Sequence, residues 1–269
     1  MGRLFNREYR ILIVPPAGLS TEIRNLRCTF SVEKTDEPEA NSATISLYNL
    51  SQKTREKLAV PGVRVTLEAG YGDEIGVISV GNDLIIESRL DGVDRVTEIK
   101  TRDSGKEIRE TVATQEVPEG ESLVDTIKGL VAKFNDVTGL SVELDALPST
   151  PAPTSKIIAK PVAEALTEIL RSIEFDWSIV DGEFRVIKQG EVSQENQLLI
   201  SVASGLLGSP SQTEKGITFR CLLSPKIKPF ISVQVESNEI VGQYKIKKVR
   251  YIGDSWSGDW VCECEAEVR

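Results

Sequence analysis

The sequence of 269 residues contains no histidine. This absence excludes Ser-His-Asp and Cys-His catalysis and every metal site that depends on imidazole. It also removes the commonest general base at neutral pH, so any acid–base chemistry would need a pair of carboxylates. The 41 acidic residues show no pair that the sequence places in an apolar pocket. We therefore expect no catalytic residue, no cofactor and no bound metal.

Cysteine is scarce as well, with four residues in the chain. Cys28 and Cys221 each stand alone among apolar or small neighbours in a strand-like run. Cys262 and Cys264 are two apart and would share one face of a strand, but no other Cys or His is near enough in sequence to complete a tetrahedral zinc site. We expect buried thiols that pack in a core.

Long apolar runs are also missing: none approaches the ~20 residues that a membrane-spanning helix needs. The first apolar segment, Ile11 to Val14, has the length of one strand, and no small-residue cleavage site follows it. The sequence therefore predicts no membrane contact and no signal peptide, and it predicts synthesis in the cytoplasm.

The glycine pairs at 70–72 and 205–208 lack the phosphate-binding patterns and are expected in turns or bulges.

The formal net charge of −9 argues against a general nucleic-acid binder, which needs a basic face. An acidic balance either keeps the protein soluble or suits a surface that polyanions pass without binding. The basic run at Lys245, Lys247, Lys248 and Arg250 is expected to form a solvated strand face with one irregularity in register. Contact with an acidic protein partner is the alternative for this run.

Residues 1–112 are predicted to be mostly strand, because apolar and polar residues alternate with period two. The predicted strands are Tyr9–Val14, Leu26–Val32, Ala43–Tyr48, Arg64–Gly72, Val77–Gly81, Asp83–Ser88 and Val96–Arg102. Ser51 is expected to cap a short helix over Gln52–Leu58.

Residues 113–190 change to helical spacing. Apolar residues three and four apart predict one helix over Leu123–Phe134 and a second that begins near Pro161 and runs to Ile173. Strands are predicted at Ser141–Leu144 and Ile157–Ile158. Two further strands, Asp176–Val180 and Glu183–Lys188, are predicted to form a hairpin around Asp181-Gly182.

Residues 191–269 alternate again, most clearly at Gln234–Glu236, Tyr244–Arg250 and Trp260–Ala266. We therefore predict a mainly β protein with an α+β insertion: two antiparallel β-barrel or sandwich domains, residues 1–112 and 191–269, flank a small α/β domain, residues 113–190.

Two series of motifs carry a resemblance to a known family. The C-terminal order GLLGSP, LLSPKIKP, GQYKIKKVRYIGD and GDWVCECEA resembles the last barrel of the central baseplate hub protein of contractile-tailed bacteriophages. The N-terminal order LRCTFSVEK, NSATISLYNLS, TREKL and VRVTLEAGYGD is similar to the first barrel of the same proteins. Together the motifs cover roughly residues 5–112 and 200–269.

The resemblance implies a structural protein of the virion, located in the tail baseplate. Two similar barrels in each chain would let a homotrimer form a ring that joins a six-fold tail tube to a three-fold central spike. The implied partners are the tail tube or tube-initiator protein, the spike protein and other baseplate proteins, and DNA would pass through the lumen without specific binding.

Two other functions stay open: a tail-tip module that binds the cell envelope, and a peptidoglycan-active enzyme. Part of the middle region, ALTEILRSIEFDWSIVDGEFRVI, also resembles the helix-plus-hairpin domain of secretins, which binds partner proteins.

Partner contacts are expected at three turn regions, Ser224–Lys228, Ile252–Trp260 and Gly205–Ser209. A tryptophan in a turn is costly to leave in water, so Trp256 is a candidate interface anchor, whereas Trp177 is expected in a core. The full set of candidate interface residues is Tyr71, Pro225, Lys226, Lys228, Trp256, Asp259 and Trp260.

Overall fold

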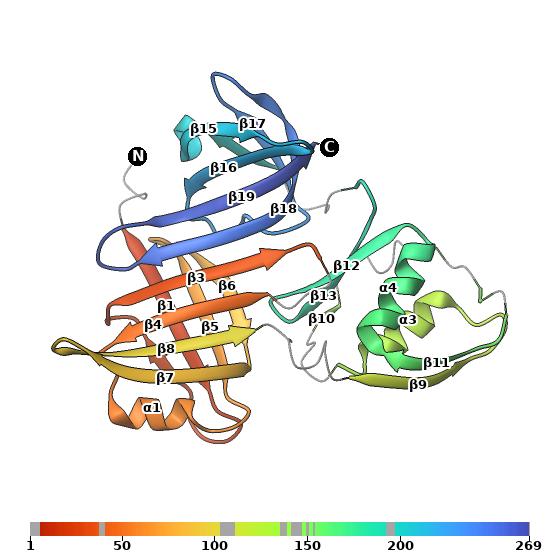
Figure 1. Cartoon of the computed structure of the whole chain (residues 1–269), viewed down its shortest axis with the longest axis horizontal. Coiled ribbons are helices and arrows are strands. Elements are labelled where there is room, and N and C mark those ends of the chain that lie inside the picture. The colour runs from red at the N-terminus through yellow and green to blue at the C-terminus, as the bar shows by residue number, and fades with distance from the viewer. Residues whose placement is uncertain are drawn as a thin grey trace.

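The computed structural model describes residues 6–37, 41–102, 111–134, 139–140, 147–148, 151–152, 154–191 and 197–268. Strands dominate this part of the chain, which confirms the mainly β prediction (Figure 1). The predicted strand at Ser141–Leu144 lies outside the described residues.

The main sheet joins the two ends of the chain in one antiparallel surface. Its order is β15-β16-β19-β18-β3-β4-β8-β7, so C-terminal strands continue directly into N-terminal strands. The joint is the pairing of β18 with β3, from Lys248 opposite Thr35 to Asp254 opposite Thr29. The bounds are β3 Cys28–Thr35, β4 Ser42–Tyr48, β7 Asp83–Asp91, β8 Asp94–Arg102, β15 Leu206–Gln212, β16 Gly216–Leu222, β18 Val241–Asp254 and β19 Trp260–Val268.

Two further strands branch from β18 in the C-terminal half of this sheet. Strand β17 (Ser232–Glu236) pairs with β18, and β14 (Leu198–Ser201) runs parallel to β17. A short 3-10 helix, η3 (Val202–Ser204), links β14 to β15.

A second sheet of order β2-β1-β5-β6 lies behind the N-terminal strands of the main sheet (Figure 1). Alternation in β1 buries Tyr9, Ile11 and Ile13, and the same period in β5 buries Val65 and Leu67. The bounds are β1 Arg7–Val14, β2 Thr21–Ile23, β5 Arg64–Tyr71 and β6 Glu74–Gly81.

One hydrophobic core unites the N-terminal and C-terminal regions, with members that range from Tyr9 to Ala266. The expectation of two barrels needs correction, because no sheet of the described residues closes on itself. The outer strands β7 and β15 each pair with one neighbour only, so the main sheet stays open.

Helix α1 (Gln52–Leu58) forms where the sequence predicts it. The Ser51 side chain accepts a hydrogen bond from the N–H of Thr54, which satisfies one of the free donors at the helix start. Lys57 lies in the last turn, where a positive charge favours the helix dipole, and Leu58 is buried.

The middle region has a hydrophobic core of its own, which runs from Ala113 to Val186. The helical faces are as predicted, since Ile127 and Leu130 of one helix and Leu166 and Leu170 of the other are buried. The bounds are β9 Val112–Val117, α3 Leu123–Val131, β10 Gly139–Leu140, β11 Lys156–Pro161, α4 Val162–Ser172, β12 Phe175–Val180 and β13 Glu183–Lys188.

The hairpin of β12 and β13 confirms the predicted two-residue turn. Asp181 and Gly182 both have positive φ, 57° and 82°, as a type I′ turn requires. Trp177 is buried beside Phe184 in this core. The separate core supports an inserted unit, and the predicted boundaries at 112/113 and 190/191 stay predictions.

Candidate interaction surface

The predicted interface residues lie in or next to three loops: the β5–β6 turn, residues 224–231 and the β18–β19 turn. Tyr71 ends β5, and its hydroxyl donates to the carbonyl of Trp260, with 3.3 Å between the oxygens. Trp260 begins β19, and its indole Nε1 donates to the carbonyl of Gly70 at 3.1 Å. Both side chains are buried, so they join β19 to β5 and lie beneath the surface.

Trp260 is held in an aromatic contact that depends on a glycine. Its ring meets Phe30 edge-on, with 5.1 Å between the ring centroids. Gly253 lies opposite Trp260 across the β18–β19 ladder, and a Cβ at this position would come within 2.3 Å of Phe30 Cζ. The missing side chain therefore makes the room into which Trp260 turns.

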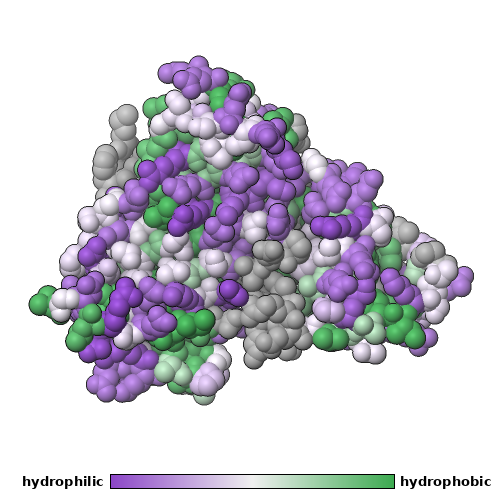
Figure 2. All heavy atoms as spheres, in the orientation of Figure 1, coloured by the Kyte–Doolittle hydropathy of each residue, from purple (hydrophilic) through white to green (hydrophobic). Residues whose placement is uncertain are grey.

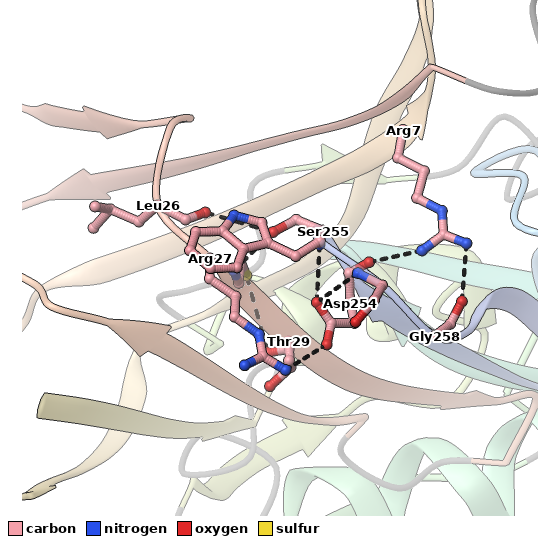
Figure 3. Close-up of polar contacts among 10 residues, drawn as sticks. Arg7, Leu26, Arg27, Thr29, Asp254, Ser255 and Gly258 are labelled. Atoms are coloured by element: carbon pink, nitrogen blue, oxygen red, sulfur yellow. Dashed lines mark hydrogen bonds and ion pairs between the residues drawn. The ribbon is translucent and has the colours of Figure 1, made fainter. Parts of the chain in front are cut away.

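The β18–β19 turn is fixed by contacts with Arg7 of β1 and with Arg27, which immediately precedes β3 (Figure 3). One carboxylate oxygen of Asp254 pairs with the guanidinium of Arg27 at 2.8 Å, and the other accepts the N–H of Trp256 at 2.9 Å. Arg7 donates to the carbonyls of Asp254 at 3.0 Å and Gly258 at 2.9 Å. These contacts anchor both ends of the turn.

The charge of Asp254 reflects these contacts. Burial alone would raise its pKa, but the hydrogen bonds from Arg27 and from two backbone N–H groups hold the pKa below its usual range. Asp254 therefore stays ionised at neutral pH, and the turn keeps its anchor.

Trp256 projects from this turn with 73% of its surface exposed. The guanidinium carbon of Arg27 lies 5.9 Å from the centre of its ring and 4.6 Å from that of Tyr48. A large aromatic on a turn that is already ordered loses little conformational freedom when a partner covers it. The structure thus leaves Trp256 free for the predicted role, while Asp259 is paired with Arg220 at 2.8 Å.

A separate groove lies along β6, which is the edge strand of the second sheet among the described residues. It has a volume of about 700 Å³ and an apolar lining that includes Ile75, Val77 and Ile231. Pro225 approaches to 3.0 Å from the position that a Cβ on Gly76 would take. The structure therefore brings the predicted residues Pro225, Lys226 and Lys228 together here, since all three line the groove. The predicted corner at Gly205–Ser209 does not line it.

Lys226 and Lys228 are engaged within the chain. Lys226 lies 3.9 Å from Glu74 at the rim of the groove, and both side chains are largely exposed. Lys228 lies 3.3 Å from a carboxylate oxygen of Asp181, in the turn of the β12–β13 hairpin. Lys34 of β3 contacts the other oxygen at 2.6 Å and is 1% exposed. Burial alone would raise the pKa of Asp181, but the two ammonium groups lower it below its ordinary value.

This ion cluster attaches the middle region to the main sheet, and two hydrogen bonds lie beside it. Asn41 donates to the carbonyl of Ile179 at 2.8 Å, and the Ser178 hydroxyl donates to the carbonyl of Thr35 at 3.2 Å. Sequence reasoning missed the cluster. A turn aspartate is ordinarily solvated, and no local pattern marks one that enters a distant sheet.

The basic run on β18 is solvated only in part, at Lys247, Lys248 and Arg250, and it has the predicted register irregularity between Ile246 and Lys248. Lys247 pairs with Asp36 at 2.9 Å and Lys248 with Glu33 at 2.9 Å. Lys245 differs, because it is buried with its ammonium 5.2 Å from the ring centre of Phe230, and burial lowers its pKa.

The four cysteines are free and buried, which confirms their predicted place in the core. Burial raises the pKa of the Cys28 and Cys262 thiols above the usual range. Within the described ranges, no group of three or more Asp, Glu, Cys or His side chains is placed to hold a metal ion. None of the described helices has the length and apolar character needed to cross a membrane.

Comparison with known proteins gives one family and several related folds. A family profile described as "Baseplate hub gp41" matches residues 17–259 of the 269. The tail protein from Neisseria meningitidis MC58 is similar with a TM-score of 0.62 and 15% identity over 96% of each chain. The 43 kDa tail protein of prophage MuSo2 from Shewanella oneidensis is similar with a TM-score of 0.67 and 7% identity over 96% of each chain.

A third solved structure comes from a secretion system. The E. coli c3393 protein, described as a type VI secretion component with structural similarity to the T4 tail proteins gp27 and gp5, has a TM-score of 0.62 and 10% identity. The match covers 96% of this chain and 76% of that one. No curated protein matches the sequence. At these identities the solved structures establish a shared fold.

Proposed function

The chain belongs to the baseplate hub gp41 family of bacteriophage tail proteins, and we propose that it forms a homotrimeric ring at the centre of the baseplate. In this proposal the ring joins a six-fold tail tube to a three-fold central spike. The tail is of the contractile type, and DNA leaves through the lumen of the ring.

The observation that carries this proposal is the composition of the main sheet. Four of its strands in order, β15-β16-β19-β18, come from the C-terminal region, and the next four, β3-β4-β8-β7, come from the N-terminal region. With β17 and β14, which branch from β18, each chain therefore contributes a C-terminal half and an N-terminal half side by side. Three copies would present six such halves to a six-fold tube while the assembly keeps three-fold symmetry for a spike.

Closure of the ring needs contacts between different surfaces of neighbouring copies. The main sheet offers β7 at one end and β15 at the other. Strand β7 pairs with β8 without interruption from Asp83 to Asp91 and exposes Ile85 at 60%. Strand β15 contains Pro210 and a register shift, which limit backbone pairing there. We infer that β7 of one copy packs against the β15 end of the next.

The partners follow from this position. They are the tail tube or tube-initiator protein, the spike protein and other baseplate proteins. Trp256 and the groove at Pro225 are the proposed contact points for these proteins, because one offers an exposed aromatic and the other an apolar hollow. The work of the protein is structural, in keeping with a chain that contains no histidine.

Size-exclusion chromatography with light scattering tests the ring. We expect a trimer, either for the purified chain or after addition of the tube and spike proteins of the same phage. Ile85→Lys should weaken trimer formation, because it places a charge on the proposed contact edge. Val112→Lys is the matched control, since Val112 is equally exposed, at 63%, but lies in the middle region. A chain that stays monomeric in every mixture and binds peptidoglycan would refute the proposal.

A further inference from the structure

Charged side chains of alternating sign cross the exposed face of the main sheet. Directly paired residues on neighbouring strands point to the same face of a sheet, so the strand register identifies the row. The row runs Arg220 on β16, Glu263 on β19, Arg250 on β18, Glu33 on β3, Ser42 on β4 and Arg102 on β8. Figure 2 shows this face, which is hydrophilic over most of the area of these strands.

Two cations of this face are in ion pairs with carboxylates. Arg220 lies 2.8 Å from Asp259 and 3.8 Å from Glu263. Lys248 lies 2.9 Å from Glu33 and stands opposite Glu265 in the ladder. Their charges are therefore balanced before any ligand approaches.

Arg250 is placed between two carboxylates of the row. Its Nε donates to the hydroxyl of Ser31 at 3.0 Å. The register sets Glu263 opposite Arg250 on one side and Glu33 opposite it on the other. These two negative charges would weaken the attraction between Arg250 and a phosphate.

The N-terminal half of the sheet repeats the arrangement. Lys100 lies 2.9 Å from Glu98 and 4.0 Å from Glu87, and Arg89 lies 3.9 Å from Glu98. Lys100 stands opposite Thr44 and hence on the same face as the row in the C-terminal half. Charge pairing is thus a property of both halves.

A shallow hollow of about 500 Å³ lies over the C-terminal half. Its charged lining consists of three carboxylates, Glu33, Glu263 and Glu265, and three cations, Arg220, Lys248 and Arg250. Retention of a polyanion needs Lys or Arg side chains that are free to neutralise phosphates. This surface presents cations, each with a carboxylate beside it, within a chain of net charge −9.

We propose that the charge-paired face of the main sheet is the surface along which a polyanion, the DNA of the proposed function, moves without being retained. The inference rests on that proposed function. It adds which face of the protein the DNA would pass and how the charges of that face avoid retaining it. The device is cross-strand neutralisation: the carboxylates occupy the cations that would otherwise bind phosphate. For weak DNA binding, the net charge of the chain then matters less than the positions of Glu33, Glu263 and Glu265.

The test removes these carboxylates and measures DNA binding. The variant E33Q/E263Q/E265Q keeps side-chain shape and removes the carboxylates next to Lys248 and Arg250, while Arg220 keeps its ion pair with Asp259. Its matched control, E56Q/E119Q/E239Q, removes three exposed carboxylates elsewhere, so both variants change the net charge from −9 to −6. Binding of a fluorescent DNA duplex is followed by anisotropy at roughly 50 mM salt, where phosphate contacts are strong.

We expect E33Q/E263Q/E265Q to bind DNA at least roughly tenfold more tightly than the wild type and the control, both of which should bind weakly, and this binding should weaken as salt is raised. Equal affinity of the two variants, or tight binding by the wild type, would overturn the inference. If circular dichroism shows that the triple variant does not fold, E263Q alone decides, because Glu263 stands between Arg220 and Arg250. None of these outcomes bears on the trimer, which light scattering tests separately.

Discussion

Replacement of Asp181 by asparagine tests the anchor between the middle region and the main sheet. Asp181 is held by Lys34 at 2.6 Å and by Lys228 at 3.3 Å, and Lys34 is 1% exposed. Asparagine has nearly the same shape and tolerates the left-handed φ of 57° at this position. D181N therefore removes the negative charge and keeps the type I′ turn.

We expect D181N to lower the free energy of unfolding by about 3–5 kcal/mol, because it leaves the ammonium of Lys34 buried without its carboxylate. K228A is the comparison. Lys228 is 24% exposed, so its loss should cost about 1 kcal/mol or less. The double variant K34M/D181N removes the buried pair together, and it should cost less than D181N alone.

Urea denaturation followed by tryptophan fluorescence measures these differences. Trp177 lies in the core of the middle region and Trp260 in the core of the main sheet, so selective replacement of either one assigns the transition to a region. The reasoning is refuted if D181N costs no more than K228A. It is also refuted if the cost of K34M/D181N equals the sum of the costs of K34M and D181N measured separately.

The same group predicts a pH dependence. The pKa of Asp181 is lowered in the folded chain, against the effect of burial, by Lys34 and Lys228. Its contribution to stability is therefore complete above the unfolded pKa of about 3.9 and is lost as the pH falls through the lower folded value. D181N should lack this part of the acid sensitivity, which urea titrations between about pH 5 and pH 2 would show.

Four further outcomes follow from the packing. Trp256→Ala should change stability by less than about 0.5 kcal/mol, whereas Trp260→Ala should cost about 3–5 kcal/mol, as measured by urea denaturation. Gly253→Ala should cost at least about 1–3 kcal/mol, because its Cβ would lie 2.3 Å from Phe30 Cζ. Gly129→Ala in α3 should instead stabilise the chain by about 0.5–1 kcal/mol, since the nearest side-chain atom is 3.4 Å away. The four buried thiols should react with a thiol reagent only after unfolding, and rapid labelling of the native chain would contradict their burial.

Local features of this fold could be predicted because their causes lie within a few residues. The Ser51 cap and the Asp181-Gly182 turn are examples, since hydrogen bonding and φ preferences act over one turn of chain. The pairing of β18 with β3 could not be predicted, because without long-range information any alternating strand can pair with any other. Open edges in place of closed barrels follow from that pairing.

The candidate site was predicted in part for the same reason. Turn chemistry placed Trp256 in a loop, and the structure exposes it at 73%. Trp260 borders the same turn but is buried, in the space that Gly253 leaves opposite it. The sequence could not predict this burial, because Gly253 and Trp260 face each other only once β18 and β19 are paired. The charge row likewise depends on register across six strands, which no single segment encodes.

The ion cluster at Asp181 has a particular place relative to the two halves of the main sheet. Lys34 belongs to β3, the N-terminal strand that pairs with β18, and it stands opposite Val249 in that ladder. Lys228 belongs to the C-terminal loop that lines the groove beside β6. Asp181 therefore holds one cation from each half, so a shift of one half against the other would lengthen at least one of the two ion pairs. The middle region has a separate core, but through Asp181 it is bound to both sides of the β18–β3 joint. The position of the middle region therefore depends on the geometry of the main sheet.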